Sequence, residues 1–270
     1  MIDIGANLTH SAFRDDLGEV LARARQAGVD TVIVTGTTVA ESLVASEIAE
    51  KHALYATAGV HPHHARDCND ATVPALRRIA EHPRVVAIGE CGLDFNRNYS
   101  PHPDQEKWFV AQLELGLSLG RPLFLHSRDA HPRFSQIIHS YKPPLAVAHC
   151  FTGGKEELHA YLDLGLYIGI TGWICDERRG KPLLALLRDI PADRLLLETD
   201  APYLTPRDMR PQPKARRNEP AFLPHVLNAV ARALGRAPEE VAAETTRNAR
   251  HFFRLDESRT SSSSQRPLAA

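Results

Sequence analysis

The sequence predicts a single-domain α/β protein and, within that class, a TIM-type (β/α)8 barrel. Short β-rich segments alternate with longer amphipathic ones along the chain, and eight β-rich segments recur without a composition break. Most are almost continuously apolar, as strands are when helices cover one face and a core fills the other. The expected strands are residues 2–7, 31–37, 55–61, 85–93, 122–127, 145–151, 167–172 and 195–200. Eight strands, each followed by a helix-sized segment, predict a closed parallel barrel.

The segments between these strands have helical spacing. Residues 14–27 place Leu17, Val20, Leu21 and Ala24 on one face, and Gly28 supplies a stop. The other expected helices are 41–52, 74–81, 105–119, 156–164 and 182–189, with 221–234 and 238–253 closing the barrel. An open, doubly wound sheet is the alternative. It would usually carry a glycine-rich phosphate loop after the first strand, and the sequence has no such motif.

The domain prediction is one barrel over residues 1–255, followed by a tail. Residues 256–270 are polar, include four consecutive serines and show no periodicity, which predicts disorder.

Composition excludes several classes of protein. No apolar stretch approaches the roughly 20 residues that a membrane span needs. The four cysteines are scattered, and a chain of 270 residues can bury a core without disulfides, so we expect a reduced, cytoplasmic protein that acts as a monomer. The formal net charge of −1 gives no global attraction to polyanions, so a polyanion site would have to be local.

Polar residues gather where the predicted strands end. In a parallel barrel, the carboxyl ends of all strands meet at one mouth, where the chemistry lies. A lone histidine at a strand end is more often a structural residue, but several histidines and carboxylates converging on one mouth would leave much buried charge to satisfy. A divalent metal ion bound by these side chains would balance this buried charge directly. The predicted ligands are Glu90, His126 and His149, at the ends of the fourth, fifth and sixth strands.

Five segments in order resemble the TatD family of metal-dependent deoxyribonucleases, within the amidohydrolase-like barrels. They are GVHPH at 59–63, GECGLDF at 89–95, LHSRDA at 125–130, HCFTG at 149–153 and ETDAPYL at 198–204. The resemblance runs from residue 1 to about 255. The segments GITGWICDERRG at 169–180 and RNEP at 217–220 are similar to the family's bacterial branch in particular.

The resemblance implies a reaction and roles for the site. Glu90 would be the central carboxylate ligand, completed by His126 and His149. Asp200 would hold or deprotonate the attacking water and touch a second ion where one is bound. The expected cofactor is a divalent ion, Mg²⁺ before Mn²⁺ or Zn²⁺, and the expected activity is 3'-5' exonuclease action on single-stranded DNA, or RNA, ends. His61 and His63 are candidates for phosphate contact or leaving-group protonation, with a second-metal role for His61 as the alternative.

One segment departs from the family pattern. Where most of the family has a His-x-His pair after the first strand, this chain has Asn7, Leu8 and Thr9. Asn and Thr are neutral oxygen ligands at best, so we expect one tight metal site and a second that is weak or absent. His10 lies next to this position, but a shift of one residue turns a side chain to the opposite strand face.

Basic and aromatic residues near the mouth predict the nucleic-acid contacts. The guanidinium of Arg128 matches phosphate geometry. The loop after the eighth strand could track a nucleic-acid backbone, with Trp173 or Tyr203 stacking a base, unless it is merely a solvated loop. A small patch on a nearly neutral protein suits a few terminal nucleotides. The basic residues of that loop are Arg207, Arg210, Lys214, Arg216 and Arg217.

Two rival functions remain open from the sequence. One is hydrolysis of ester or carbon–nitrogen bonds on the same barrel, such as deacylation of mischarged tRNA. The other is a non-catalytic scaffold that has lost its metals, although the presence of Glu90, His126, His149 and Asp200 together argues against it.

Overall fold

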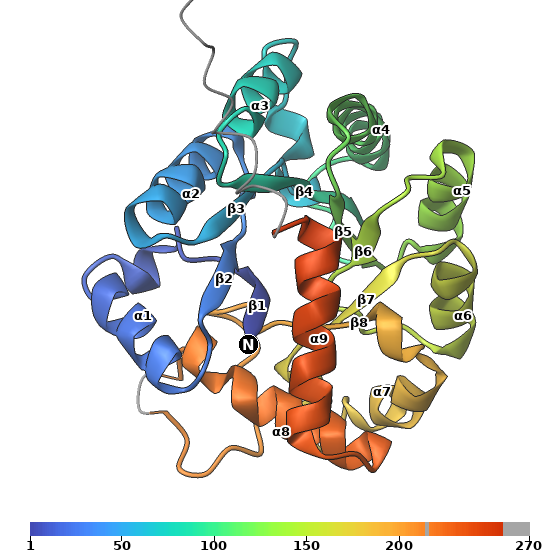
Figure 1. Ribbon diagram of the computed structural model, residues 1–270. Coiled ribbons are helices and arrows are strands. Elements are labelled where there is room, and N and C mark those ends of the chain that lie inside the picture. Colours follow the sequence, from blue (N-terminus) through green and yellow to red (C-terminus); the bar gives the residue numbers. More distant parts are fainter. Residues whose placement is uncertain (214–215, 256–270) are drawn as a thin grey trace, which may run out of the picture.

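Eight parallel strands form one sheet in the order of the chain, β1 to β8, with helices around it, in a computed structural model that describes residues 1–213 and 216–255 (Figure 1). The strands are β1 Ile2–Ala6, β2 Thr31–Val34, β3 Tyr55–Ala58, β4 Val85–Asp94, β5 Leu123–Arg128, β6 Ala146–Ala148, β7 Tyr167–Ile170 and β8 Leu195–Leu197. The predicted TIM-type (β/α)8 barrel is therefore confirmed. Lys214 and the expected disordered tail lie outside the described residues.

Strand lengths differ from the expectation at the carboxyl ends. Six strands stop before their predicted last residue, because the chain turns into the mouth there. β4 and β5 instead run one residue further, since Asp94 pairs with Arg128 in their parallel register. This extension brings the last residues of the two strands side by side at the mouth.

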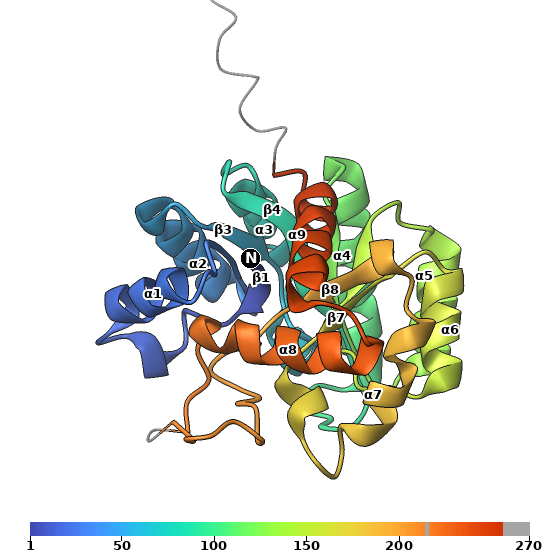
Figure 2. The same cartoon turned by 60° about the horizontal axis from the view of Figure 1, so that its bottom comes forward.

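The helices form the outer layer, and Figures 1 and 2 show them around the sheet. They are α1 Leu17–Gln26, α2 Val39–His52, α3 Thr72–Ala80, α4 His102–Leu119, α5 His131–Tyr141, α6 Lys155–Asp163, α7 Lys181–Leu186, α8 Leu223–Leu234 and α9 Pro238–Phe253. Helix α5 has no counterpart among the predicted helices. Its buried residues Phe134, Ile137 and Ile138 do have helical spacing, after a proline in the first turn.

Helix α9 closes the amino-terminal end of the barrel. Phe252 and Phe253 belong to the apolar cluster that fills the barrel interior, together with Ile4 and Phe124. The Phe252 ring meets Tyr167 of β7 edge to face at 5.1 Å between centroids. One end of the barrel is thus plugged by apolar packing, and the polar residues lie at the other. No helix in residues 1–213 and 216–255 has the length and apolarity to cross a bilayer.

The first and last strands meet through a short seam. Ala6 and Ala201 form an isolated parallel bridge, supported by hydrogen bonds from Asn7 N to Ala201 O at 2.7 Å and from Asp200 N to Gly5 O at 2.9 Å. The buried carboxylate of Asp3 adds to it, accepting from Thr199 N at 2.9 Å and Thr199 Oγ1 at 2.5 Å. Burial raises the pKa of Asp3 to about 7.

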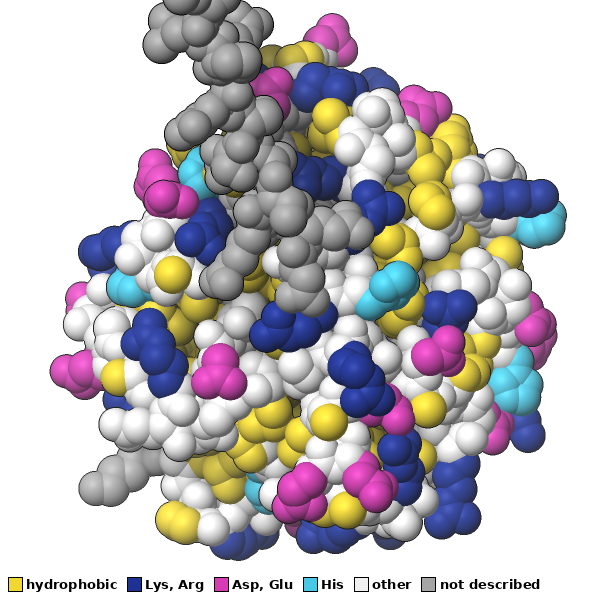
Figure 3. All heavy atoms as spheres, viewed as in Figure 1, with side chains coloured by type: hydrophobic (Ala, Val, Ile, Leu, Met, Phe, Trp, Pro, Cys, Tyr) yellow, Lys and Arg dark blue, Asp and Glu magenta, His cyan; other side chains and the backbone are white. Residues whose placement is uncertain are grey.

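The surface seen from the side of α9 carries charges of both signs. Figure 3 shows lysine, arginine, aspartate and glutamate side chains interspersed over the described part of this face. Such mixing gives no extended field of one sign. A polyanion would therefore have to be recognised elsewhere, by a local group of cations.

Candidate metal centre and active site

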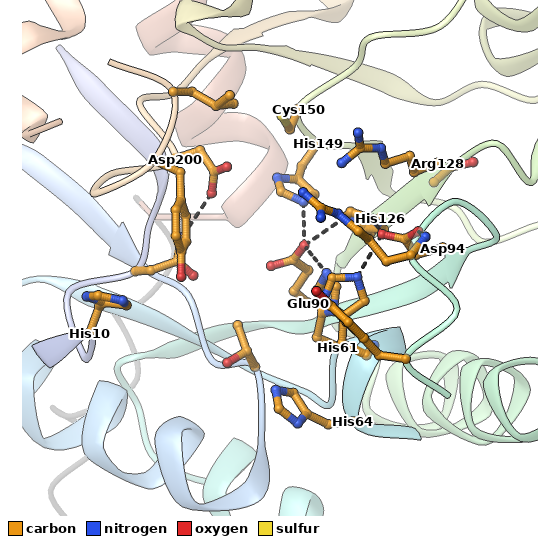
Figure 4. Close-up of a pocket in the computed structure, with 18 of the residues that line it drawn as sticks. His10, His61, His64, Glu90, Asp94, His126, Arg128, His149, Cys150 and Asp200 are labelled. Carbon is orange, nitrogen blue, oxygen red and sulfur yellow. Dashed lines mark hydrogen bonds and ion pairs between the residues drawn. The ribbon is translucent and has the colours of Figure 1, made fainter. Parts of the chain in front are cut away.

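A cavity of about 600 Å³ opens at the carboxyl ends of the strands. Residues that follow or end the strands line its floor, and Figure 4 shows them pointing into it. This is the mouth at which the sequence placed the chemistry. The strand-end residues that line it are Asn7, His61, Glu90, Asp94, His126, His149 and Asp200.

Glu90 lies at the centre of three histidines. Its Oε1 is 2.7 Å from His149 Nε2, 3.0 Å from His126 Nδ1 and 3.2 Å from His61 Nε2. The structure thus brings together Glu90, His126 and His149, as the sequence predicted, and adds His61 as a third imidazole. All four residues are buried or nearly so, and the nitrogens come from the ends of β3, β5 and β6.

Gly89 allows β4 to present Glu90 at this point. Its φ is +137°, a conformation that residues with a Cβ rarely adopt, and a Cβ there would lie 2.1 Å from Phe124 O. Glu90 N then donates to Gly36 O at 2.9 Å, which fixes the backbone from the other side. The glycine before the carboxylate is therefore a requirement of the close approach between β4 and β5.

The histidines set the charge state of Glu90. Burial by itself would raise its pKa, but His149, His61 and the hydrogen bond with His126 outweigh burial and hold the pKa of Glu90 well below its usual range. Burial lowers the pKa of His61 to about 4, against the pull of Glu90. An ionised carboxylate beside a neutral imidazole is a donor pair suited to a divalent cation.

Asp94 orients two of the histidines. Its Oδ2 is 2.8 Å from His63 Nε2 and 3.4 Å from His126 Nε2, while its Oδ1 accepts from Arg97 N at 2.8 Å. Burial would raise the pKa of Asp94, but hydrogen bonds from His126 and His63 bring it far below its usual range. The carboxylate therefore fixes the His126 ring that presents Nδ1 to Glu90, an arrangement common behind metal-ligating histidines.

Glu198 stands behind His149 in a similar way. It is fully buried, its Oε1 accepts from Cys150 N at 2.5 Å, and its Oε2 lies 3.4 Å from His149 Nδ1. Burial alone would lower the pKa of His149, but Glu90 and Glu198 raise it well above its usual value. His149 is thereby held between two carboxylates, one on each ring nitrogen.

From the sequence, no role was assigned to Asp94 or Glu198. The period of the strand carries a signal for Asp94, because residues four apart on β4 share a face and Glu90 is the other one. Glu198 gives a weaker signal. It is two residues before Asp200, and only the position of His149 shows what it contacts.

Asp200 faces this cluster from the other side of the cavity (Figure 4). Its Oδ1 accepts a hydrogen bond from Asn7 Nδ2 at 2.9 Å. Burial raises the pKa of Asp200 to about 8, opposed by His149 and supported by the nearby negative charges of Glu90 and Glu198. A carboxyl group whose pKa lies near neutrality is suited to accept a proton.

The donor set fits a divalent ion. His61, Glu90 and His126 each offer a ligand atom, and these atoms lie within 4.8 Å of one another. One carboxylate oxygen and imidazole nitrogens are the ligands that Zn²⁺ and Mn²⁺ take in hydrolase sites. The carboxylates behind His126 and His149 supply the outer support that such ligands usually have.

Cations and aromatic rings form the rim. Arg97, Arg128, Tyr99, Trp173 and Tyr203 all line the cavity. Tyr99 and Tyr203 are 54% and 51% exposed, so both rings are accessible at the mouth. Trp173 lies under the guanidinium of Arg179 at 4.4 Å. Of the residues predicted to bind nucleic acid, the structure places Arg128, Trp173 and Tyr203 at the cavity.

The loop arginines are placed differently from the expectation. Arg217 does not offer its guanidinium to a ligand, because that group pairs with Asp16 at 2.7 and 2.8 Å and with Glu219 at 2.7 Å. Arg210 donates to backbone carbonyls of its own loop, and Arg207 lies 3.7 Å from Asp176. Arg216 is exposed, but neither it nor the other three lines the cavity.

A parallel eight-stranded barrel with histidines and carboxylates converging at its mouth defines a hydrolase barrel that binds a divalent metal. The family described as TatD related DNase matches residues 2–254, and the chain belongs to this family.

Relatives support this assignment over the whole barrel. The "3'-5' ssDNA/RNA exonuclease TatD" of Pantoea vagans is 56% identical over 259 residues, which cover 94% of this chain and 100% of the relative. The protein of the same name from Edwardsiella piscicida is 54% identical with the same coverage. Among solved structures, the TatD homologue YJJV of Escherichia coli is 29% identical with a TM-score of 0.85, covering 94% of this chain and 98% of that one.

Proposed function

We propose that this protein hydrolyses phosphodiester bonds at the 3' ends of single-stranded DNA or RNA, with a divalent ion at Glu90. The observation that carries the proposal is the Glu90-centred histidine cluster on the floor of a cavity whose rim holds Arg97, Arg128, Tyr99 and Tyr203. The names of the relatives at 54–57% identity support single-stranded DNA or RNA as the substrate class and 3'-to-5' as the direction of cleavage.

Glu90, His126 and His149 would hold the ion, with His61 as a further ligand. A bound divalent ion polarises a phosphoryl oxygen and lowers the pKa of bound water from 15.7 toward about 7. Asp94 and Glu198 keep the His126 and His149 rings in place.

Asp200 is the proposed general base. It is partly buried, it faces the cluster, and Asn7 holds one of its oxygens, so the other oxygen can receive a proton from water. His63, fixed by Asp94, is the proposed donor to the leaving oxygen. A cation beside Glu90 would lower the pKa of Asp200 below its value without the ion, because it favours the charged form.

The rim suits the end of a single strand. Arg128 and Arg97 can bind backbone phosphates, and the exposed rings of Tyr99 and Tyr203 can stack bases, which every nucleotide offers. A cavity of about 600 Å³ is in the range that encloses one small-molecule-sized group. It therefore fits terminal nucleotides better than a continuous duplex.

The third imidazole bears on the choice of ion. Imidazole nitrogen suits Zn²⁺ and Mn²⁺ better than Mg²⁺, which prefers oxygen ligands. We therefore expect the protein to bind Mn²⁺ and Zn²⁺ more tightly than Mg²⁺ and to need a higher concentration of Mg²⁺ for activity. Reconstituting metal-free protein with each ion, and measuring binding and turnover together, tests this order.

The decisive experiment compares substrates and ends. Purified protein is given 5'-labelled single-stranded DNA, the matching duplex, and the same strand with a phosphorothioate-blocked 3' end. We expect a ladder from the 3' end of the first, with chelator abolishing it and the block preventing it. Release of amino acid from mischarged tRNA without any ladder would favour the ester-hydrolase alternative. Neither reaction with any of the three ions would favour a non-catalytic scaffold.

A further inference from the structure

Three metal-binding residue types come together outside the mouth. Cys175 ends the 3₁₀ helix η3 (Gly172–Cys175), Asp208 lies in the loop after β8, and His225 is in the first turn of α8. Each offers one ligand atom, and these atoms lie within 4.8 Å of one another. His225 Nε2 is 2.7 Å from Asp208 Oδ1. The segments are far apart in the sequence, so only the fold brings the three side chains together.

Cys175 is not set up as a nucleophile. Its side chain is 4% exposed, and burial, with the neighbouring Asp208 carboxylate, raises the pKa of the thiol to about 12. The His225 imidazole pairs with Asp208, and the Asp208 carboxylate beside the sulfur favours the protonated thiol. A thiol of this kind becomes a thiolate when a metal replaces its proton.

We propose that Cys175, Asp208 and His225 bind a thiophilic divalent ion, Zn²⁺, at a site separate from the Glu90 centre. Thiolate sulfur, imidazole nitrogen and carboxylate oxygen are its three protein ligand types, and the two negative groups balance its charge. The thiol proton is released to solvent when the ion binds. Asp208 also lines a surface cleft with Ile174, Arg188 and Arg232. A water molecule from this cleft would be the fourth ligand.

The position of the site suggests what the ion does. It would join the loop after β8 to η3 and α8. Trp173, two residues before Cys175, lines the catalytic cavity, and Arg207 precedes Asp208. A metal here would hold one wall of the mouth in place without touching the substrate. We therefore expect its loss to lower thermal stability more than turnover.

Cobalt distinguishes this site from the catalytic one. A Co²⁺–thiolate bond gives a charge-transfer absorption that histidine and carboxylate ligands do not give. Metal-free protein is titrated with Co²⁺ alone, and bound zinc is counted separately after dialysis. The variants are Cys175→Ser and His225→Ala, with Cys150→Ser and Cys68→Ser as matched controls, because Cys150 lines the catalytic cavity and Cys68 lies in neither site.

We expect the thiolate band in the parent and in both controls. The band should be absent in Cys175→Ser. In His225→Ala, the apparent affinity for Co²⁺, read from this band, should fall at least about tenfold. Tight zinc should fall by one ion per chain in Cys175→Ser. The proposal is wrong if the parent shows no thiolate band, or if Cys175→Ser keeps the band and the zinc of the parent. Should Cys175→Ser fail to fold, the parent titration and His225→Ala still decide.

Discussion

The amide of Asn7 donates a hydrogen bond to the carboxylate of Asp200 at 2.9 Å, across the seam between the first and last strands. The residue that replaces the family's usual first histidine therefore does not point an anionic or imidazole ligand into the cavity. It uses its N–H to hold the proposed base. A second ion beside Asp200 would have to displace this bond and then coordinate neutral oxygens.

This contact leads to a prediction on metal stoichiometry at the mouth. In a Cys175→Ser background, which removes the proposed zinc site, one tight ion per chain should remain after dialysis. Replacing both Asn7 and Thr9 with histidine should raise the number toward two, because imidazole offsets dehydration of the ion better than a neutral oxygen does. Elemental analysis of both proteins checks this. Two tight ions before the histidines are introduced would contradict it.

His126→Ala should remove nuclease activity while changing stability little. Its Nδ1 faces Glu90 in the cavity, and residues at the mouth serve chemistry more than packing. We expect turnover to fall at least about a hundredfold and the melting temperature to stay within a few degrees. His159→Ala, on the outer helix α6, is the matched control. Turnover within tenfold of the parent would exclude His126 as a ligand.

Asp94→Asn tests whether the carboxylate behind His126 positions it. The amide keeps the shape but loses the charge that holds His126 and His63. Metal affinity should fall about 10–100-fold, and a higher metal concentration should restore part of the turnover. Asp67→Asn, an exposed carboxylate at the last residue of the 3₁₀ helix η2 (Pro62–Asp67), which also carries His63, is the control. Unchanged metal affinity in Asp94→Asn would leave this residue with a purely structural role.

Arg128→Gln should weaken substrate binding and reduce the dependence of that binding on salt concentration. A single-strand phosphate contact contributes a slope of about 0.7 in the logarithm of affinity against that of salt concentration. The Michaelis constant should therefore rise while the turnover number changes less. Arg216→Gln is the control, since Arg216 is exposed but does not line the cavity. An equal effect in both variants would show that the loop also grips the backbone.

The pairing of Arg217 predicts a pH-dependent contribution to stability. A hydrogen bond from Arg217 lowers the pKa of Asp16, and Glu219 has a lowered pKa because Arg23 and Arg217 outweigh its burial. Carboxyl groups whose pKa is lowered by folding stabilise the protein above about pH 4. This stabilisation is lost as the pH falls through their folded-state pKa values.

Arg217→Gln should therefore lower the melting temperature by on the order of a few degrees at pH 7. The difference from the parent should shrink as the pH falls below about 4, where these carboxyl groups begin to take up protons in the unfolded chain, and it should go on shrinking as the pH approaches the lower pKa values of the folded parent. Arg14→Gln, an exposed arginine outside this group of ion pairs, is the control. A difference that stays constant from pH 7 to pH 3 would contradict the assigned ion pairs. The measurement is thermal unfolding across this range.

The barrel and the core of the site were predictable because both depend on local pattern. Glu90, His126 and His149 follow β-rich segments, and in a parallel barrel every strand end points to the same mouth. Once the fold is assigned, convergence of these residues follows without knowledge of any side-chain conformation.

What the sequence could not supply depends on contacts between distant segments. Arg217 is a cation in a basic loop by sequence, but Asp16, 201 residues earlier, takes its guanidinium. Which way Asp94 points relative to His126 is set by the register of β4 against β5. The grouping of Cys175 with Asp208 and His225 has no motif spacing at all, because three separate connections bring the residues together.

The short seam between β1 and β8 separates the active site into two parts that can be disturbed independently. Glu90 and its histidines are carried by β3 to β6, on continuously paired strands, while Asn7 and Asp200 lie on opposite sides of the joint held by the Ala6–Ala201 bridge and the Asp3 carboxylate. A local opening of that joint would part the proposed base from its amide donor without disturbing the ligands of the ion. Metal binding and hydrolysis can thus be lost separately. A protein weakened only at this joint would keep its ion but would no longer hydrolyse its substrate.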